Sequence, residues 1–154
     1  MFWINVRRFI KGVTVIELMI SVAILAVIIS LAVPLYTGSR IRSSVTECIN
    51  GATGTQFAIT EYRLTYGQWP PDLEVTGTGN TPSSQHCNPP GNYQKETGAF
   101  TVDVNEPAIS FELVNIAPRM TPIISTGHAV RWKCTPGETE PKEIAYLPAN
   151  CRND

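Results

Sequence analysis

The run KGVTVIELM, residues 11–19, contains the strongest candidate for chemistry in this chain. A stretch without acidic residues ends at Gly12, an apolar stretch begins at Val13, and one carboxylate, Glu17, stands at the fifth position after the glycine. A charged side chain inside a membrane helix costs about 2.5–3.5 kcal/mol on insertion scales, so it needs a partner or a function. Glu17 is therefore a candidate functional residue, and the alternative is a hydrated carboxylate near the membrane surface.

Four cysteines form the second set of reactive side chains: Cys48, Cys87, Cys134 and Cys151. No two of them stand at C-x-x-C spacing, whereas a zinc site made of four cysteines normally uses closely spaced pairs. If this part of the chain is exported, it meets an oxidising compartment in which disulfides form. The spacing therefore favours disulfides over a metal site.

The remaining sequence contains no catalytic constellation. His86 and His128 lack other metal-ligand residues at the required spacing, no serine lies in a nucleophile-elbow pattern, and no phosphate-binding glycine loop follows a strand. We interpret both histidines as surface loop residues. The sequence predicts neither an enzyme nor a bound cofactor.

The segment from Gly12 to Glu17 is similar to the processing site of the type IV pilin family. The resemblance implies that prepilin peptidase, a membrane-embedded enzyme, cuts between Gly12 and Val13 and methylates the new amine. The family usually has phenylalanine at the position of Val13, and the leader of residues 1–12 is longer than many. After the cut, the amine lies four residues from Glu17, about 6 Å along a helix. The resemblance implies that Glu17 pairs with such an amine on a neighbouring subunit.

A proline near the end of the apolar stretch extends the resemblance. Pro34 falls where the family has a proline in its first helix, and this implies a helix kink there. The alternative is a routine kink of any membrane helix, which needs no family role.

The C-terminal runs WKC and YLPANCR, residues 132–134 and 146–152, look like the disulfide-bounded end region of type IVa pilins. The resemblance implies a bridge between Cys134 and Cys151. The two remaining cysteines, Cys48 and Cys87, would then pair with each other.

The apolar stretch from Val13 to Leu35 has about the 20 residues that a helix needs to cross a bilayer. Three basic residues precede it, Arg7, Arg8 and Lys11, and such residues favour keeping that end in the cytoplasm. The head would then lie on the far side of the membrane.

A secretory signal peptide cut after Ala32 is the alternative interpretation of the same stretch, because Ser30-Leu31-Ala32 resembles a small-residue cleavage site. Glu17 inside the apolar run argues against a signal peptide. The helical periodicity that continues beyond Ala32 argues against it too.

Apolar residues at three-or-four spacing continue the helix to about Tyr66, and GQWPP, residues 67–71, ends it. The next stretch, from Asp72 to Thr97, is rich in turn-forming residues and predicts a long surface loop. Three strand candidates follow: Ala99–Val104, Ile109–Ile116 and Ala129–Cys134.

These elements predict an α+β, pilin-like fold. A long N-terminal helix has a protruding transmembrane half and an amphipathic half, and the second half packs on an antiparallel β-sheet. The expected division is a leader at 1–12, a transmembrane and filament-core helix at 13–35, and a periplasmic or extracellular head at 36–154 that includes the second half of the helix.

The resemblance implies a structural subunit of a type IV pilus, in adhesion, twitching motility or DNA uptake. Its partners would be other pilin subunits, prepilin peptidase and the assembly machinery. It would reside in the inner membrane as a single-pass protein before assembly and in the extracellular pilus afterwards. The alternatives are a minor pilin, a type II secretion pseudopilin or, in a different class, a membrane-anchored periplasmic enzyme or binding protein.

Nucleic acid is a further partner that the charge balance does not indicate. Without the three basic residues of the leader, the chain has 9 basic and 13 acidic residues. This balance gives no overall attraction to nucleic acid, although a local basic patch stays open as an alternative.

Overall fold

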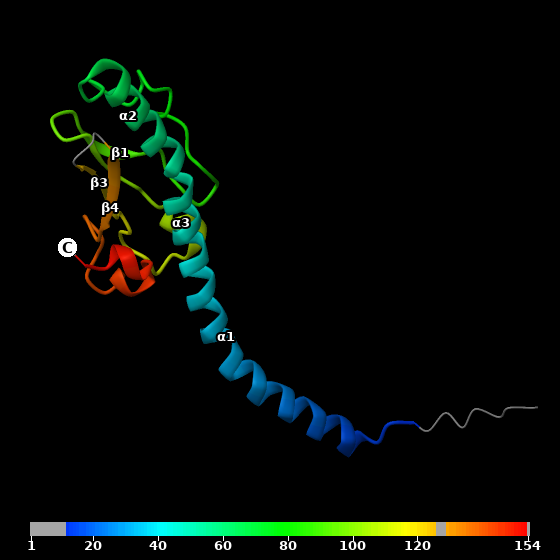
Figure 1. The fold of residues 1–154 in the computed structure, drawn as a ribbon. Coiled ribbons are helices and arrows are strands. Elements are labelled where there is room, and N and C mark those ends of the chain that lie inside the picture. Colours follow the sequence, from blue (N-terminus) through cyan, green and yellow to red (C-terminus); the bar gives the residue numbers. More distant parts are fainter. Residues whose placement is uncertain (1–11, 126–128, 154) are drawn as a thin grey trace, which may run out of the picture. The chain divides into compact units, whose positions relative to one another are not determined.

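The computed structural model describes residues 12–125 and 129–153, and the chain forms two compact units, Met1–Thr37 and Gly38–Asp154. Helix α1 (Val15–Gly51) passes through the boundary and contributes to both units (Figure 1). The predicted leader up to Lys11 and the whole of His128 lie outside the described residues.

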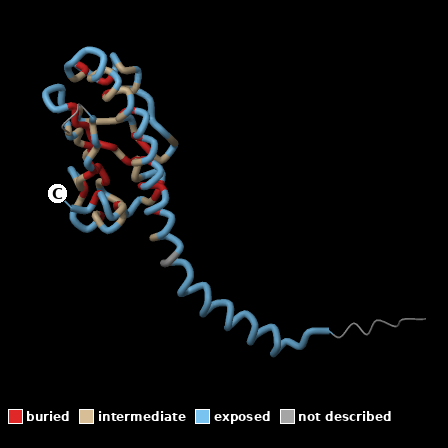
Figure 2. The backbone as a smooth tube through the Cα atoms, in the orientation of Figure 1, coloured by how far each residue is buried: buried red, intermediate tan, exposed pale blue. Residues whose placement is uncertain are grey.

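The described part of the first unit is the apolar N-terminal stretch. From residue 12 to residue 33 every side chain is exposed (Figure 2). Its helix is long and apolar enough to cross a membrane, by length and composition. A helix satisfies its backbone hydrogen bonds internally, which is the condition for lying in hydrocarbon. No other part of the described chain covers these side chains, so they are available to contact other molecules.

Helix α2 (Thr53–Tyr66) follows α1 after one residue, Ala52. The helical hydrogen bonds continue through this residue, because the Ala52 N–H donates to the Cys48 carbonyl and the Ala52 carbonyl accepts from Gln56, both at 3.0 Å. The single helix predicted from Val13 to Tyr66 therefore starts two residues later than expected and is interrupted once. Gly67 ends α2 with φ of 74°, a left-handed conformation that glycine adopts readily.

The head contains a four-stranded antiparallel sheet with the strand order β1-β2-β3-β4. Its strands are β1 (Gly91–Gln94), β2 (Ala99–Thr101), β3 (Arg119–Ile124) and β4 (Val130–Thr135). The register pairs Phe100 with Met120 and Met120 with Cys134. Two 3-10 helices, η1 (Ile144–Tyr146) and η2 (Ala149–Cys151), follow the sheet.

Three details of the strand prediction are wrong, and one of them is strand β3, which lies outside every predicted strand. Residues 109–116 form no strand, because the short helix α3 (Glu106–Ile109) and a turn occupy the start of this segment. Strand β1 lies inside the predicted loop of 72–97. The first strand candidate is shorter than expected and ends at Thr101, whereas the last one is confirmed as β4 to within one residue.

One apolar core fills the head between the helices and the sheet (Figure 2). The helices contribute buried residues at three-or-four spacing, namely Ile41, Val45, Cys48, Ala52 and Ile59. The sheet contributes Phe100 and Met120, and the Trp132 ring meets the Phe100 ring edge-on at a centroid distance of 5.7 Å. The amphipathic half-helix packed on an antiparallel sheet is thus confirmed.

The segment between α2 and β1 is held against the rest of the head by specific contacts. The Tyr93 hydroxyl donates a hydrogen bond of 2.8 Å to the Pro70 carbonyl, and burial raises the pKa of Tyr93 to about 12. Ser83 approaches α1 so closely that a Cβ on Gly51 would stand 2.4 Å from the Ser83 Cβ. Only glycine fits at that crossing.

Candidate functional site

The predicted processing site lies at the start of α1. Gly12 and Val13 are exposed and precede the helix, so both flank a peptide bond outside regular structure. The Thr14 hydroxyl accepts a 3.3 Å hydrogen bond from the Glu17 backbone N–H. A threonine three residues before a glutamate is the spacing of a capping box, and it explains why the helix begins at Val15. The sequence carries this signal, but our interpretation of it missed Thr14.

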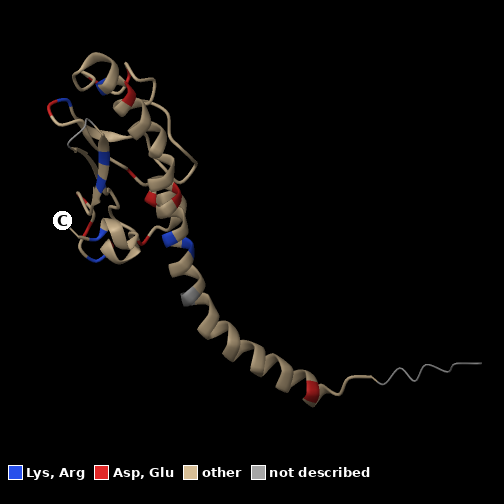
Figure 3. Cartoon of the chain, viewed as in Figure 1, with Lys and Arg blue, Asp and Glu red and all other residues tan. Residues whose placement is uncertain are grey.

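Glu17 lies in the first turn of α1, where a carboxylate is favoured by the helix dipole. It is the one acidic position on the apolar stretch, which is otherwise uncharged up to residue 39 (Figure 3). The structure therefore gives Glu17 a local role at the helix start. Its pairing with an amine of another subunit stays a prediction, as does a kink at Pro34, which lies within α1.

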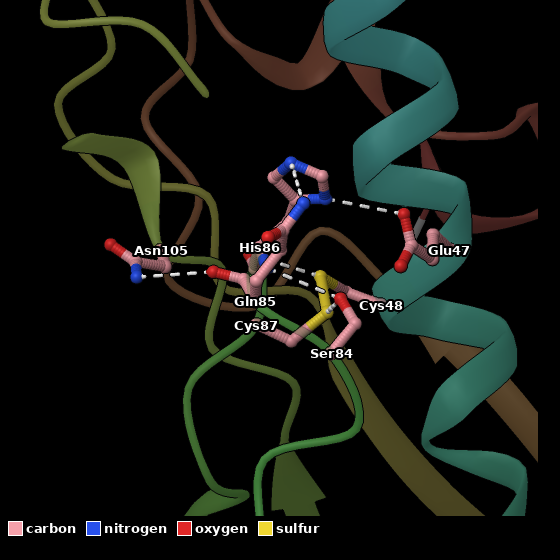
Figure 4. The surroundings of a disulfide bond; sticks show 7 residues. All are labelled: Glu47, Cys48, Ser84, Gln85, His86, Cys87 and Asn105. Carbon is pink, nitrogen blue, oxygen red and sulfur yellow. Dashed lines mark hydrogen bonds and ion pairs between the residues drawn. A yellow bond between two sulfur atoms is a disulfide. The ribbon is translucent and has the colours of Figure 1, made fainter. Parts of the chain in front are cut away.

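The Cys48–Cys87 bridge joins α1 to the loop before β1 (Figure 4). The two Cα atoms are 5.5 Å apart, within the usual range for a disulfide. Both cysteines are buried in the core of the head. The expected pairing is confirmed.

A polar cluster lies beside this disulfide, and its members contact the Glu47 carboxylate. His86 Nδ1 lies 3.3 Å from Glu47 Oε2, and the His86 side chain is 18% exposed. Ser84 Oγ accepts the His86 backbone N–H at 3.2 Å. A hydrogen bond from Ser84, followed by His86, holds the pKa of Glu47 below its usual value. His86 thus lies in a loop, as expected, but its side chain is half-buried and paired with Glu47.

Serine, histidine and glutamate are also the residue types of hydrolytic triads, in which the histidine ring accepts the serine proton. Here the histidine ring and the serine side chain both contact the Glu47 carboxylate. The serine oxygen accepts a hydrogen bond from the backbone N–H of His86. This arrangement fastens the loop to α1. Among the described residues, no group of three or more His, Cys, Asp and Glu side chains could hold a metal ion.

The Cys134–Cys151 bridge joins β4 to η2 near the C-terminal end, with the Cα atoms 4.6 Å apart. The Arg152 side chain adds two hydrogen bonds, from Nε to the Leu147 carbonyl at 2.8 Å and from Nη2 to the Ala145 carbonyl at 3.2 Å. The expected bridge is confirmed, and it closes the C-terminal segment onto the edge of the sheet.

Two family models match the sequence. The model of the pilin family, described as pilin (bacterial filament), matches residues 41–152. The model of the prokaryotic N-terminal methylation motif matches residues 7–33. The first match covers the head and the second covers the predicted cut site and the apolar helix.

Some individual relatives match along nearly the whole chain, and others match about half of it. A type IV major pilin protein PilE1 of Neisseria gonorrhoeae is 31% identical, and the match covers 94% of this chain and 94% of the relative. The fimbrial protein EcpC of Eikenella corrodens is 28% identical, with 93% and 91% covered. A fimbrial protein of Neisseria meningitidis is 39% identical over 46% of this chain and 42% of the relative.

Proposed function

Because the chain belongs to the pilin family, we propose that it is the precursor of a type IV pilus subunit that prepilin peptidase cuts between Gly12 and Val13. The same enzyme methylates the new amine of Val13. The mature chain has a structural function, as a subunit of a filament built from many copies.

Before assembly, the apolar part of α1 holds the subunit in the inner membrane as a single-pass protein, with the head outside the cytoplasm. Assembly machinery then moves the subunit into the extracellular pilus. The disulfides Cys48–Cys87 and Cys134–Cys151 suit this location, because such bonds form and persist outside the cytoplasm.

The observation that carries this proposal is the exposure of the apolar helix. Its large side chains, from Val15 to Val33, are 55–79% exposed. An exposed apolar surface of this extent needs a covering, and lipid can supply one before assembly. The same helices of other copies can supply the covering in a filament, where packed side chains replace lipid.

Glu17 has a specific task in this proposal. In a filament core with little water, its carboxylate and the amine of Val13 on an adjoining subunit would each be costly alone, and pairing offsets that cost. The pair also fixes how far one helix slides along the next. Assembly thus depends on both the cut and the carboxylate.

The intact mass of the subunit in sheared surface filaments tests the proposal. We expect a chain that starts at Val13, carries one methyl group on its amine and retains both disulfides. A filament subunit that starts at Met1 or Val33 would contradict the processing step. Absence of the chain from all filaments, together with an uncut chain in the membrane, would instead support an anchored enzyme or binding protein.

A further inference from the structure

The head has a hollow of 240 Å³ beside the junction of α1 and α2. Of the described residues that line it, none is charged. Its polar members carry hydroxyl or amide groups, namely Thr55, Thr78, Thr81, Ser83 and Asn88. Phe100 and Val102 belong to its apolar part. Four other hollows of the described head each have at least one charged residue in their lining, so this neutral and partly polar hollow differs from them.

Thr55 in α2 contributes a hydroxyl group that needs a partner. This residue is 6% exposed and lines the hollow. Thr46 and Thr60 each donate a 2.7 Å hydrogen bond to the carbonyl four residues earlier in their helix. The Thr55 hydroxyl makes no such bond and has no other partner among the described residues. No side-chain oxygen of the described chain is both sealed off and unpartnered, so this hydroxyl stays within reach of a small molecule.

The Asn88 side chain is a second hydrogen-bonding group of the hollow without a partner among the described residues. Its residue is partly buried, and its backbone N–H is held by a 2.9 Å hydrogen bond to the Asp103 carbonyl. A side-chain amide offers two donors and an acceptor, and a hydroxyl offers a donor and two acceptor lone pairs. Thr55 and Asn88 therefore present both kinds of group to a ligand without any charge.

The walls of the hollow are held by contacts within the head. The Cys48–Cys87 bridge ties α1 to the residue before Asn88. Ser83 lies so close to Gly51 that a larger residue does not fit at position 51. A site that is formed before its ligand arrives loses less conformational entropy on binding. The hollow thus meets this condition for a binding site.

These features select the chemical class of the ligand. A charged ligand would lose its hydration without meeting an opposite charge, which is costly. A purely apolar ligand would leave the Thr55 hydroxyl and the Asn88 amide unpaired. A hydroxyl group both donates and accepts hydrogen bonds, so it matches either of them. The C–H groups of the same ligand can cover the apolar part of the lining.

The volume limits the ligand to about one substituted ring. A cavity of roughly 150 Å³ accommodates benzene, whereas sites for drug-sized ligands have roughly 300–1,000 Å³. The hollow, at 240 Å³, lies between these sizes. A six-membered ring with several hydroxyl groups satisfies both the volume and the hydrogen-bonding groups.

We propose that this hollow binds one neutral sugar residue, whose hydroxyl groups pair with the Thr55 hydroxyl and the Asn88 amide. The ligand is a free sugar or the terminal sugar of a glycan chain, since the two share this chemistry. This binding function goes beyond the proposed function and does not depend on filament assembly.

Titration of the full chain with methyl glycosides of neutral hexoses and N-acetylhexosamines tests the proposal. The chain is kept in a detergent with a zwitterionic head group, because a glycoside detergent would compete. Amide signals of Thr55, Thr78 and Asn88 in NMR spectra should shift and saturate at millimolar concentrations for at least one glycoside. Absence of saturable shifts with every glycoside, or shifts confined to other parts of the head, would overturn the proposal.

Two variants test the recognition by hydrogen bonds. Thr55→Val keeps the shape and removes the hydroxyl, so it should weaken binding by roughly three- to tenfold. Thr65→Val, on the same helix and outside the lining of the hollow, is the matched control and should leave binding unchanged. Asn88→Leu, in the loop, should weaken binding similarly and keeps the proposal testable if Thr55→Val fails to fold. Unchanged binding by a folded Thr55→Val or Asn88→Leu chain would overturn the assigned contacts.

Three further probes separate the possible ligands. Glucuronate, which is charged, and cyclohexane, which has no hydroxyl group, should each bind at least tenfold more weakly than the best glycoside. Equal binding of either probe would overturn the selection of a neutral sugar. A disaccharide that ends in the best sugar supports a glycan chain as the ligand if it binds as well as the methyl glycoside, and a free sugar if it binds more weakly.

Discussion

The indole N–H of Trp132 donates a hydrogen bond of 3.2 Å to the Thr60 hydroxyl, and this bond joins β4 to α2. The same hydroxyl donates to the Gln56 carbonyl at 2.7 Å. Thr60 therefore connects the sheet to the helical backbone through one oxygen atom. This position is partly buried, so loss of the oxygen leaves an indole N–H without its partner.

Thr60→Val should destabilise the head by about 1–2 kcal/mol, because valine keeps the shape and removes the acceptor. Thr60→Ser keeps the hydroxyl and should cost less. Chemical unfolding of the full chain in detergent, followed by tryptophan fluorescence, measures both. A valine variant as stable as the unchanged chain would show that the hydrogen bond contributes nothing to stability.

Glu143 is a buried carboxylate that accepts hydrogen bonds from backbone N–H groups, as the carbonyl groups of a neighbouring strand would. It is 2% exposed and accepts the backbone N–H groups of Val114 at 2.7 Å and Asn115 at 3.0 Å. Glu143→Ala should cost about 1–3 kcal/mol, because two partly buried N–H donors lose a charged acceptor. Glu140→Ala, at a partly exposed neighbour, should stay within about 0.5 kcal/mol. Unfolding curves of the two variants compare them directly, and a similar cost for both would contradict this role.

The Glu47 cluster predicts acid sensitivity. Its hydrogen bond from Ser84 and its contact with His86 lower the pKa of Glu47 in the folded head below 4.5. A lowered pKa contributes stability above pH 4.5, and that contribution is lost as the pH falls through the folded value. Wild type should therefore exceed Glu47→Gln in stability at neutral pH, and the difference should shrink on acidification. Ser84→Ala should reduce the same difference, and a gap that widens in acid would contradict the assignment.

A substitution of Glu17 should distinguish an effect on filament assembly from an effect on the folding of the head. Glu17→Ala removes the carboxylate at the start of α1 and leaves the head unchanged, so the subunit should be inserted, cut and disulfide-bonded but yield few or no filaments. Electron microscopy and intact mass of the membrane fraction measure both outcomes. Thr14→Val is the matched control, because it removes the cap and keeps the carboxylate. Normal filaments from Glu17→Ala would leave only the local role of Glu17 at the helix start.

The sequence predicted the parts of the fold that repeat a simple pattern. The buried positions Ile41, Val45 and Cys48 follow helical spacing, and β4 alternates between the core and solvent. The disulfides were expected from the resemblance of the C-terminal end. The local start of α1 was also readable, since Thr14 and Glu17 have the spacing of a capping box.

The errors came from contacts between residues distant in sequence. Residues 109–116 alternate like a strand, but the Glu143 carboxylate, about 30 residues later, takes two of the N–H groups that a strand would need. Strand β3 contains Pro122, which usually argues against a strand inside a sheet. Strand β2 pairs only with Arg119 and Met120 of β3. Pro122 lies beyond the paired part of β3 on that side, so its missing N–H is tolerated there. Neither fact can be read from local periodicity.

The Cys48–Cys87 bridge has a mechanical consequence. A tensile load that enters the head along α1 reaches Cys48 and can pass through the disulfide to Cys87, so the 39 intervening steps of the chain carry no tension. The bypassed segment would span about 130 Å if it were fully extended, at about 3.4 Å per residue. The whole of α2 lies within the bypassed segment. A subunit pulled lengthwise would therefore keep α2 unstretched, whatever the rest of the head does.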